Sequence, residues 1–224
     1  EEALAIYDKV IADYPGTDGA IEAELRIADA YRGKGKNEEA ARRYEEFMKA
    51  QPGHTLFWYA MVSQGDCHQR LGQAQYWHNV ETSQVAANAT VNERFLRAIP
   101  VYLEVIDGSP SKEQVAEARN RIVAIGDLYI SGRHWEAAEA VYRTCLDGRH
   151  EGEDEFRFRL GLVWRDQGQF EIQSLRAMRR KPPEEMVSGF KKAAAEFVSL
   201  VQAFPTEEWA KRVGEAVITM ADTY

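Results

Sequence analysis

The sequence predicts an all-α solenoid built from stacked antiparallel helix pairs, and two recurring patterns carry this prediction. In the first pattern, Ala40, Tyr44, Phe47 and Pro52 follow one another at spacings of 4, 3 and 5 residues. The first three residues share one helical stripe, and the proline ends the helix. The same spacing occurs at 3–15, 98–110 and 193–205, and a further copy begins at Ala138, Tyr142 and Cys145, with His150 in place of the proline.

The second pattern covers five residues and precedes the helices of the first pattern. Its copies at 27–31, 64–68, 125–129, 160–164 and 220–224 have Ala or Gly in second place and an aromatic ring in fifth place. A residue that small lets two helix backbones approach closely, and the ring fills the space beside the contact. We expect the following residues to hold the repeats together: Ala28, Tyr31, Ala40, Tyr44, Pro52, Gly126, Tyr129, Ala138, Tyr142, Gly161, Trp164, Ala193, Phe197 and Pro205.

These patterns divide the chain into four complete repeats with half a repeat at each end, about eleven helices in all. Residues 1–15 and 206–224 are the half repeats, 16–52 and 111–150 are short repeats, and 53–110 and 151–205 are long repeats. Pro15, Pro110 and Pro205 are evenly spaced, 95 residues apart, which indicates two copies of a double-repeat unit. Because the sequence begins and ends within expected helices, we expect a fragment of a longer chain.

Each long repeat contains an insert between its two helices, at 73–97 and at 169–192. We expect each insert to follow a Gly-Gln pair as an extra helical segment, then a break, then a lengthened second helix. The breaks are expected at 88–90 and at Pro182-Pro183. Two readings of each insert stay open. Tyr76 and Trp77 of the first insert are either partner anchors or packing residues, and the basic run of Arg176, Arg179 and Arg180 in the second is either a docking patch or a solvated face.

Composition and motifs argue against several classes of function. The formal charge of −8 does not suit a phosphate-binding surface for nucleic acid. No run approaches the roughly 20 apolar residues of a membrane-spanning helix. We expect no cofactor, metal or catalytic site, because glycine-rich phosphate loops, HExxH, paired CxxC and GxSxG motifs do not occur. Cys67 and His68 are adjacent and point apart on a helix, so they are a poor nucleophile–base pair. His68 is expected in the core as a replacement for an aromatic ring, and Cys145 is expected as a small packing residue.

Together the two patterns resemble the tetratricopeptide repeat over nearly the whole chain. The resemblance is strongest from Ala28 to Pro52 and from Gly126 to Tyr142, and weaker at His68 and His150. It implies a right-handed superhelix whose first helices line a concave groove, and a protein- or peptide-binding function. The spacing from Pro15 to Pro52 is similar to repeats of bacterial cell-envelope proteins, such as outer-membrane assembly lipoproteins and the Tol-Pal coordinator. That similarity favours the periplasm or cell envelope over the cytoplasm.

The resemblance also places a column of aspartates on the groove: Asp29, Asp66, Asp127 and Asp222, with Leu162 as the exception. These carboxylates either attract a basic ligand or pair with neighbours such as Arg32 and Arg70. A chaperone-type groove that clamps a C-terminal carboxylate is not expected, since acidic residues would repel the tail. The candidate partner-binding residues are Asp29, Asp66, Asp127, Asp222, Arg32, Tyr59, Tyr76, Trp77, Arg176, Arg179 and Arg180.

The sequence therefore predicts a non-catalytic scaffold or adaptor that binds a partner protein or peptide. Two alternatives stay open. The chain could be an obligate structural subunit of a larger assembly, in which case it should aggregate in isolation. It could also be the repeat region of an enzyme whose catalytic domain lies outside this chain, which a longer natural chain with a strand-rich extension would support.

Overall fold

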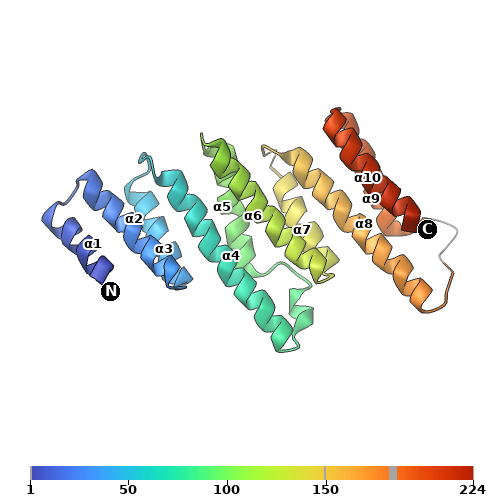
Figure 1. Cartoon of the computed structure of the whole chain (residues 1–224), viewed down its shortest axis with the longest axis horizontal. Coiled ribbons are helices and arrows are strands. Elements are labelled where there is room, and N and C mark those ends of the chain that lie inside the picture. Colours follow the sequence, from blue (N-terminus) through green and yellow to red (C-terminus); the bar gives the residue numbers. More distant parts are fainter. Residues whose placement is uncertain (1, 149, 182–185, 224) are drawn as a thin grey trace. The chain divides into compact units, whose positions relative to one another are not determined.

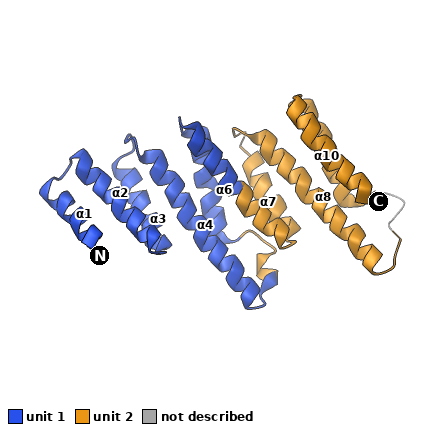
Figure 2. Ribbon diagram, in the orientation of Figure 1, with its two compact units in different colours: residues 1–85, 92–122 blue, residues 86–91, 123–224 orange. Residues whose placement is uncertain are grey.

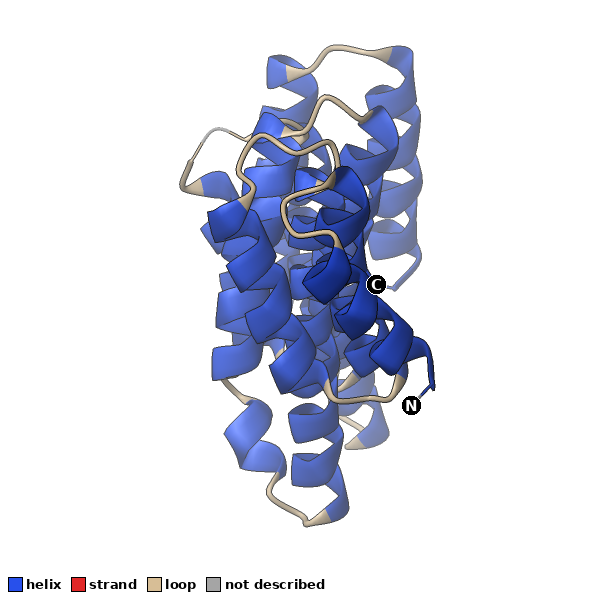
Figure 3. Cartoon of the chain, turned by 90° about the vertical axis from the view of Figure 1, so that its left-hand side faces the viewer, coloured by secondary structure: helices blue, strands red, loops and turns tan. Residues whose placement is uncertain are grey.

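All regular secondary structure in the described part of the chain is helical, which confirms the predicted all-α class. The computed structural model describes residues 2–148, 150–181 and 186–223, and these contain no strand (Figure 3). The α-helices of these residues are α1 (Glu2–Asp13), α2 (Asp18–Gly33), α3 (Asn37–Ala50), α4 (Phe57–Glu81), α5 (Glu93–Gly108), α6 (Lys112–Ser131), α7 (Trp135–Leu146), α8 (Glu153–Ala177), α9 (Ser188–Ala203) and α10 (Glu207–Thr223), with one short 3₁₀ helix, η1 (Val85–Asn88) (Figure 1).

The chain divides into two compact units, and the division falls within α6 (Figure 2). Unit 1 comprises Glu1–Val85 and Asn92–Ile122, and unit 2 comprises Ala86–Val91 and Val123–Tyr224. In unit 1, α1 packs on α2, α2 on α3, α3 on α4 and α4 on α5. In unit 2, α7 packs on α8, α8 on α9, and α10 on both α8 and α9. Consecutive packing of this kind is what stacked helix pairs require.

Within unit 1 the helices form two layers. The first helices of successive pairs, α2 and α4, lie in front, and the second helices, α3 and α5, lie behind them (Figure 1). The predicted prolines mark the ends of second helices: Pro52 follows the end of α3 at Ala50, and Pro110 follows the end of α5 at Gly108. Pro15 and Pro205 stand in the same place after α1 and α9.

The two helices of a pair meet where a small residue of the first helix faces a buried ring of the second. A methyl group on Gly65 of α4 would lie only 2.6 Å from Cε1 of Tyr102 on α5. A methyl group on Gly161 of α8 would lie 2.3 Å from Cε1 of Phe197 on α9. Tyr102 and Phe197 are fully buried, so neither ring can turn into solvent. Gly126 of α6 makes the same kind of contact with Tyr142 of α7.

The helical segment expected at the start of each insert is continuous with the helix that precedes it. The first helix of each long pair simply continues through the predicted boundary, so that α4 and α8 are both 25 residues long. Their partners α5 and α9 are both 16 residues long. This accounts for finding ten α-helices, rather than about eleven, in the described residues.

Each long pair uses its extra length to make a second glycine–ring contact. A methyl group on Gly72 would lie 2.6 Å from Cδ1 of Phe95, and one on Gly168 would lie 2.4 Å from Cδ1 of Phe190. Both glycines lie two turns beyond the first contact along the same face of the helix. The Gly-Gln pairs that look like the start of an insert are therefore sites of close helix approach.

The long helices α4 and α8 also end in the same way. Ser83 has φ 61° and Arg179 has φ 57°, which places both residues in the left-handed region just after the helix. Beyond them, the Gln84 amide donates to the Asn79 carbonyl at 2.7 Å, and the Arg180 amide donates to the Leu175 carbonyl at 2.9 Å. The expected break at 88–90 begins in η1, whereas the Pro182-Pro183 break lies outside the described residues, as does Tyr224.

The glycine–ring contact predicts opposite effects for one substitution at two helical glycines of unit 2. Gly161→Ala should lower the free energy of unfolding by about 1–3 kcal/mol, because the new methyl group overlaps the buried Phe197 ring. Gly214→Ala in α10 should raise it by up to about 1 kcal/mol, because nothing lies within 4 Å of the new methyl group and alanine favours helix. Urea unfolding followed by circular dichroism measures both; stabilisation by Gly161→Ala would contradict the contact.

Candidate binding groove

Unit 1 contains a cavity of about 500 Å³ between three successive first helices. Residues of α2, α4 and the first half of α6 line it. The lining residues are Asp29, Arg32, Gly33, Tyr59, Val62, Ser63, Asp66, Arg70, Gln114, Glu117 and Arg121. Three carboxylates and three guanidinium groups thus face one another, and their formal charges balance. We call this space the unit 1 cavity.

Asp29 of α2 makes side-chain contacts with the next two helices, α3 and α4. Its Oδ1 accepts hydrogen bonds from the Tyr44 hydroxyl of α3 at 2.5 Å and from the Tyr59 hydroxyl of α4 at 2.8 Å. Arg32 donates to the same oxygen at 3.3 Å, and Arg26 donates to Oδ2 at 3.2 Å. Burial, followed by hydrogen bonding to Asp29, raises the pKa of Tyr59 above its ordinary value. Both hydroxyls therefore remain protonated donors at neutral pH.

The buried carboxylate of Asp66 forms ion pairs with arginines from three helices. Its side chain is only 5% exposed, and its Oδ2 accepts a hydrogen bond from Arg70 Nε at 2.9 Å. Its Oδ1 lies 3.1 Å from Arg121 Nη1 of α6. Arg32 of α2 approaches at 3.8 Å and donates to the Ser63 hydroxyl at 3.0 Å. The carboxylate therefore fixes the positions of three guanidinium groups on the cavity wall.

The candidate residues Asp29, Asp66, Arg32 and Tyr59 thus come together in one place. The pairing of the aspartates with Arg32 and Arg70, one of the two readings of the column, is present in the structure. Because both carboxylates are already satisfied by arginines and hydroxyls, neither is free to attract a basic ligand. The expectation that this groove does not clamp a C-terminal carboxylate stays a prediction.

Asp127 belongs to a separate network in unit 2. It lies 3.5 Å from Arg159 Nη1, and Arg159 Nε donates to Glu155 at 2.8 Å. Arg212 of α10 holds the other side of Glu155 with two hydrogen bonds at 2.7 and 3.1 Å. The Arg212 guanidinium also lies 4.3 Å from the ring centroid of Trp209. Burial raises the pKa of Asp127 despite the neighbouring Arg159.

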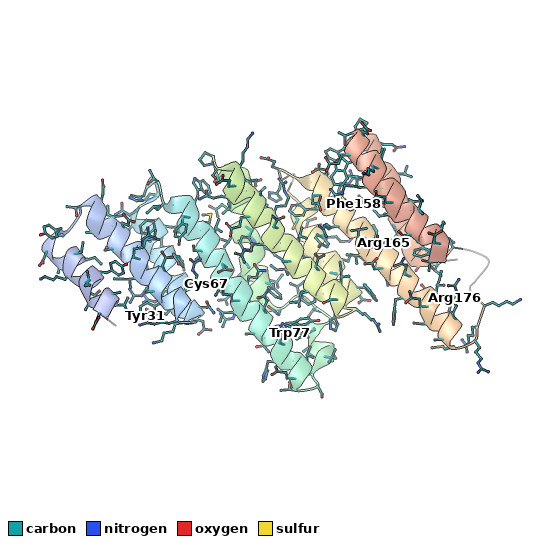
Figure 4. All side chains as sticks on the ribbon, in the orientation of Figure 1. Tyr31, Cys67, Trp77, Phe158, Arg165 and Arg176 are labelled. Atoms are coloured by element: carbon teal, nitrogen blue, oxygen red, sulfur yellow. The ribbon has the colours of Figure 1, made fainter. Side chains whose placement is uncertain are left out.

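The remaining candidate residues are not part of either network. Asp222 is exposed on α10. Tyr76 is buried, whereas Trp77 next to it is 52% exposed near the end of α4 (Figure 4). The two readings of the first insert therefore apply to different residues. Tyr76 packs inside the protein, whereas Trp77 is exposed and can contact a partner. Arg176, Arg179 and Arg180 are exposed at the end of α8, and whether they dock a partner stays a prediction.

Both cysteines are core residues, as the sequence predicts for Cys145. Cys67 and Cys145 are fully buried, and burial raises the pKa of each thiol to about 12. At neutral pH both are therefore protonated and poor nucleophiles. His68 is half-buried, and burial together with nearby arginines lowers its pKa. Among the described residues, no group of three or more histidine, cysteine or acidic side chains is arranged to hold a metal ion.

Comparison with known proteins identifies two repeats. Residues 22–54 match a family model described as tetratricopeptide repeat, and residues 122–155 match a second model with the same description. Two segments of this chain match the tetratricopeptide repeat. The first contains Asp29 and Arg32 of the unit 1 cavity. No curated protein matched the chain in the corresponding search.

The tetratricopeptide-repeat matches cover α2 with α3 and the region around α7. They do not distinguish the repeats of bacterial cell-envelope proteins from others, so that resemblance stays a prediction. No described helix is long and apolar enough to span a membrane.

Sequence reasoning missed two important members of the cavity. Arg121 and Glu117 both come from α6, where they lie one turn apart with Arg121 Nη2 donating to Glu117 at 3.1 Å. Arg121 is far from Asp66 in the sequence, and the ion pair forms only because α4 and α6 are stacked. No local signal in the sequence links Arg121 to Asp66, because the two residues belong to helices that are separated along the chain by α5.

The ion pairs around Asp66 predict that removing its charge lowers the stability of the protein. Asp66→Asn should lower the free energy of unfolding by about 1–3 kcal/mol, because it leaves Arg70 and Arg121 beside a neutral, buried amide. Glu45→Gln, which removes an exposed ion pair with Lys49 on α3, should change it by less than about 0.5 kcal/mol. Equal effects in urea titrations would show that Asp66 is no more than a surface charge.

The unit 2 network predicts a specific acid sensitivity. Burial by itself would raise the pKa of Glu155, but hydrogen bonds from Arg212 and Arg159 outweigh it and hold the pKa below the ordinary value. The resulting stabilisation is fully present above about pH 4.5, the unfolded value, and is lost as pH falls through the folded pKa.

Glu155→Gln should therefore be less stable than the wild type at pH 6, and the difference should disappear on acidification. Unfolding titrations between pH 6 and pH 3 measure the difference at each pH. A constant difference over that range would mean that the carboxylate's charge does not contribute.

Proposed function

We propose that this chain is a protein-binding scaffold that holds an extended segment of a partner in the unit 1 cavity. The observation that carries the proposal is the cavity itself, where side chains of α2, α4 and α6 converge over about 500 Å³. A space of that size accommodates a few side chains of a peptide. The tetratricopeptide-repeat matches support it further, since such repeats generally mediate protein–protein interactions.

The chemistry of the cavity suits recognition better than catalysis. Its polar groups are held by one another: Tyr59 and Arg32 by Asp29, and Arg70 by Asp66. Groups fixed in this way lose little conformational entropy when a ligand binds, which improves affinity and specificity. The lining residues include no histidine or cysteine to act as a base or thiol nucleophile. The proposed role is therefore that of a non-catalytic adaptor.

Placement in a bacterial periplasm or cell envelope remains part of the proposal. It rests on the similarity of residues 16–52 to repeats of cell-envelope proteins and on nothing in the cavity. The exposed Trp77 is compatible with an adaptor that folds alone and keeps a second surface for a partner.

Filling the cavity should abolish peptide binding without disturbing the fold. Gly33 lines the cavity at the end of α2, and nothing lies within 4 Å of a methyl group added there. Gly33→Trp should therefore place an indole at the cavity without a backbone clash. Twelve-residue linear peptides selected on the wild-type protein by display should bind this variant at least tenfold more weakly in fluorescence anisotropy titrations.

Gly53→Trp is the matched control for this experiment. Gly53 is exposed, has the same open surroundings and lies outside the residues that line the cavity. Its dissociation constants should stay within twofold of wild type. Selected peptides that bind both variants equally well would place the binding surface elsewhere, and failure to select any peptide would count against a peptide-binding scaffold.

A further inference from the structure

The unit 1 cavity offers hydrogen-bond donors that are not used within the described part of the protein. Arg70 uses only its Nε for Asp66, and its Nη1 and Nη2 atoms make no hydrogen bond or ion pair with another described residue. Arg121 uses Nη1 for Asp66 and Nη2 for Glu117. The Arg70 and Arg121 side chains are 51% and 37% exposed, whereas that of Asp66 is 5% exposed. A ligand therefore meets guanidinium groups before it meets the carboxylate that holds them.

Asp66 sets the geometry of this pair of arginines. Arg70 binds one carboxylate oxygen and Arg121 binds the other, so the two guanidinium groups come from different helices and flank the same group. Arg32 lies behind them and is already committed to Asp29, Tyr59 and Ser63. The arrangement leaves two oriented, charged donors at the cavity surface, a geometry that suits a planar oxyanion.

We propose that Arg70 and Arg121 form an anion subsite that binds the side-chain carboxylate of an aspartate or glutamate in the partner segment. Asp66 is the positioning residue of this subsite. The inference deepens the proposed scaffold function and rests on it, because it names the chemistry of the segment that the cavity holds. It differs from the reading in which the aspartate column attracts a basic ligand, and it agrees with the one in which the aspartates pair with neighbouring arginines.

The negative charge of the whole chain does not prevent this interaction. At physiological salt the Debye length is about 8 Å, so distant carboxylates contribute little to the potential at the subsite. The nearest competitor is Glu117, which already binds Arg121 and does not contact Arg70. An incoming carboxylate can bind the two free Nη atoms of Arg70 and share Arg121 with Glu117.

The test compares versions of the peptides selected on the wild-type protein. Each is synthesised with an acetylated N-terminus and an amidated C-terminus, once with its acidic residues intact and once with every Asp changed to Asn and every Glu to Gln. The acidic versions should bind the wild-type protein about tenfold more tightly than the amide versions. The difference should fall below about twofold in Arg70→Gln and in Arg121→Gln.

Arg97→Gln provides the matched protein control. Arg97 is 53% exposed and pairs one turn away with Glu93 on α5, much as Arg70 pairs with Asp66, but it does not line the cavity. This variant should keep the full tenfold difference between the acidic and amide peptides. Circular dichroism melts of the three variants confirm that the comparison is made on folded protein.

The outcomes separate this inference from the function on which it rests. Acidic and amide peptides that bind equally, while Gly33→Trp still blocks both, would overturn the anion subsite and leave the scaffold function standing. If the amide versions bind tightly only when their C-terminus is left as a free carboxylate, the subsite binds the end of the chain and not a side chain. That result would overturn the inference. If Gly33→Trp does not weaken the binding of the peptides, the proposed function is overturned, and the inference with it.

Discussion

The close approach of a first-helix backbone to a second-helix ring is the contact on which the rest of this structure depends. Gly65 against Tyr102 and Gly161 against Phe197 bring the two helices of a pair so near that no side chain fits between them. In the long pairs, Gly72 and Gly168 repeat the contact two turns further along. Because the rings are fully buried, the distance and the register of each pair are both fixed.

The same contact determines where the functional groups point. Asp66 directly follows Gly65, so on the helix its side chain is turned about 100° from the face that carries the glycine. Asp29 and Asp127 stand in the same relation to Ala28 and Gly126. With the small residue held against a ring, the aspartate is directed to the face where first helices meet one another. There Asp66 reaches Arg121, and Asp127 reaches Arg159 of α8.

The sequence predicts the helices and their pairing well, because the signals for both are local. A proline closes α3 at Pro52, and Ala40 and Tyr44 lie buried on one stripe. The role of Gly72 is harder to predict, because glycine inside a helix usually weakens it. Only the buried ring of Phe95, on another helix, explains why glycine is required there. The sequence predicts the pairing of Asp66 with Arg70 but not with Arg121, because Arg121 meets Asp66 only after the repeats have stacked.

A double-mutant cycle at Gly72 and Phe95 tests the central contact most directly. It compares the unfolding free energies of the wild type, Gly72→Ala, Phe95→Leu and the double variant. If the glycine is needed because the ring occupies its space, shortening the ring should remove much of the cost of the methyl group. The expected coupling is about 1 kcal/mol or more in the double variant's favour. Additivity within about 0.3 kcal/mol would show that the ring and the glycine act independently, and would contradict this account of how the pairs are held.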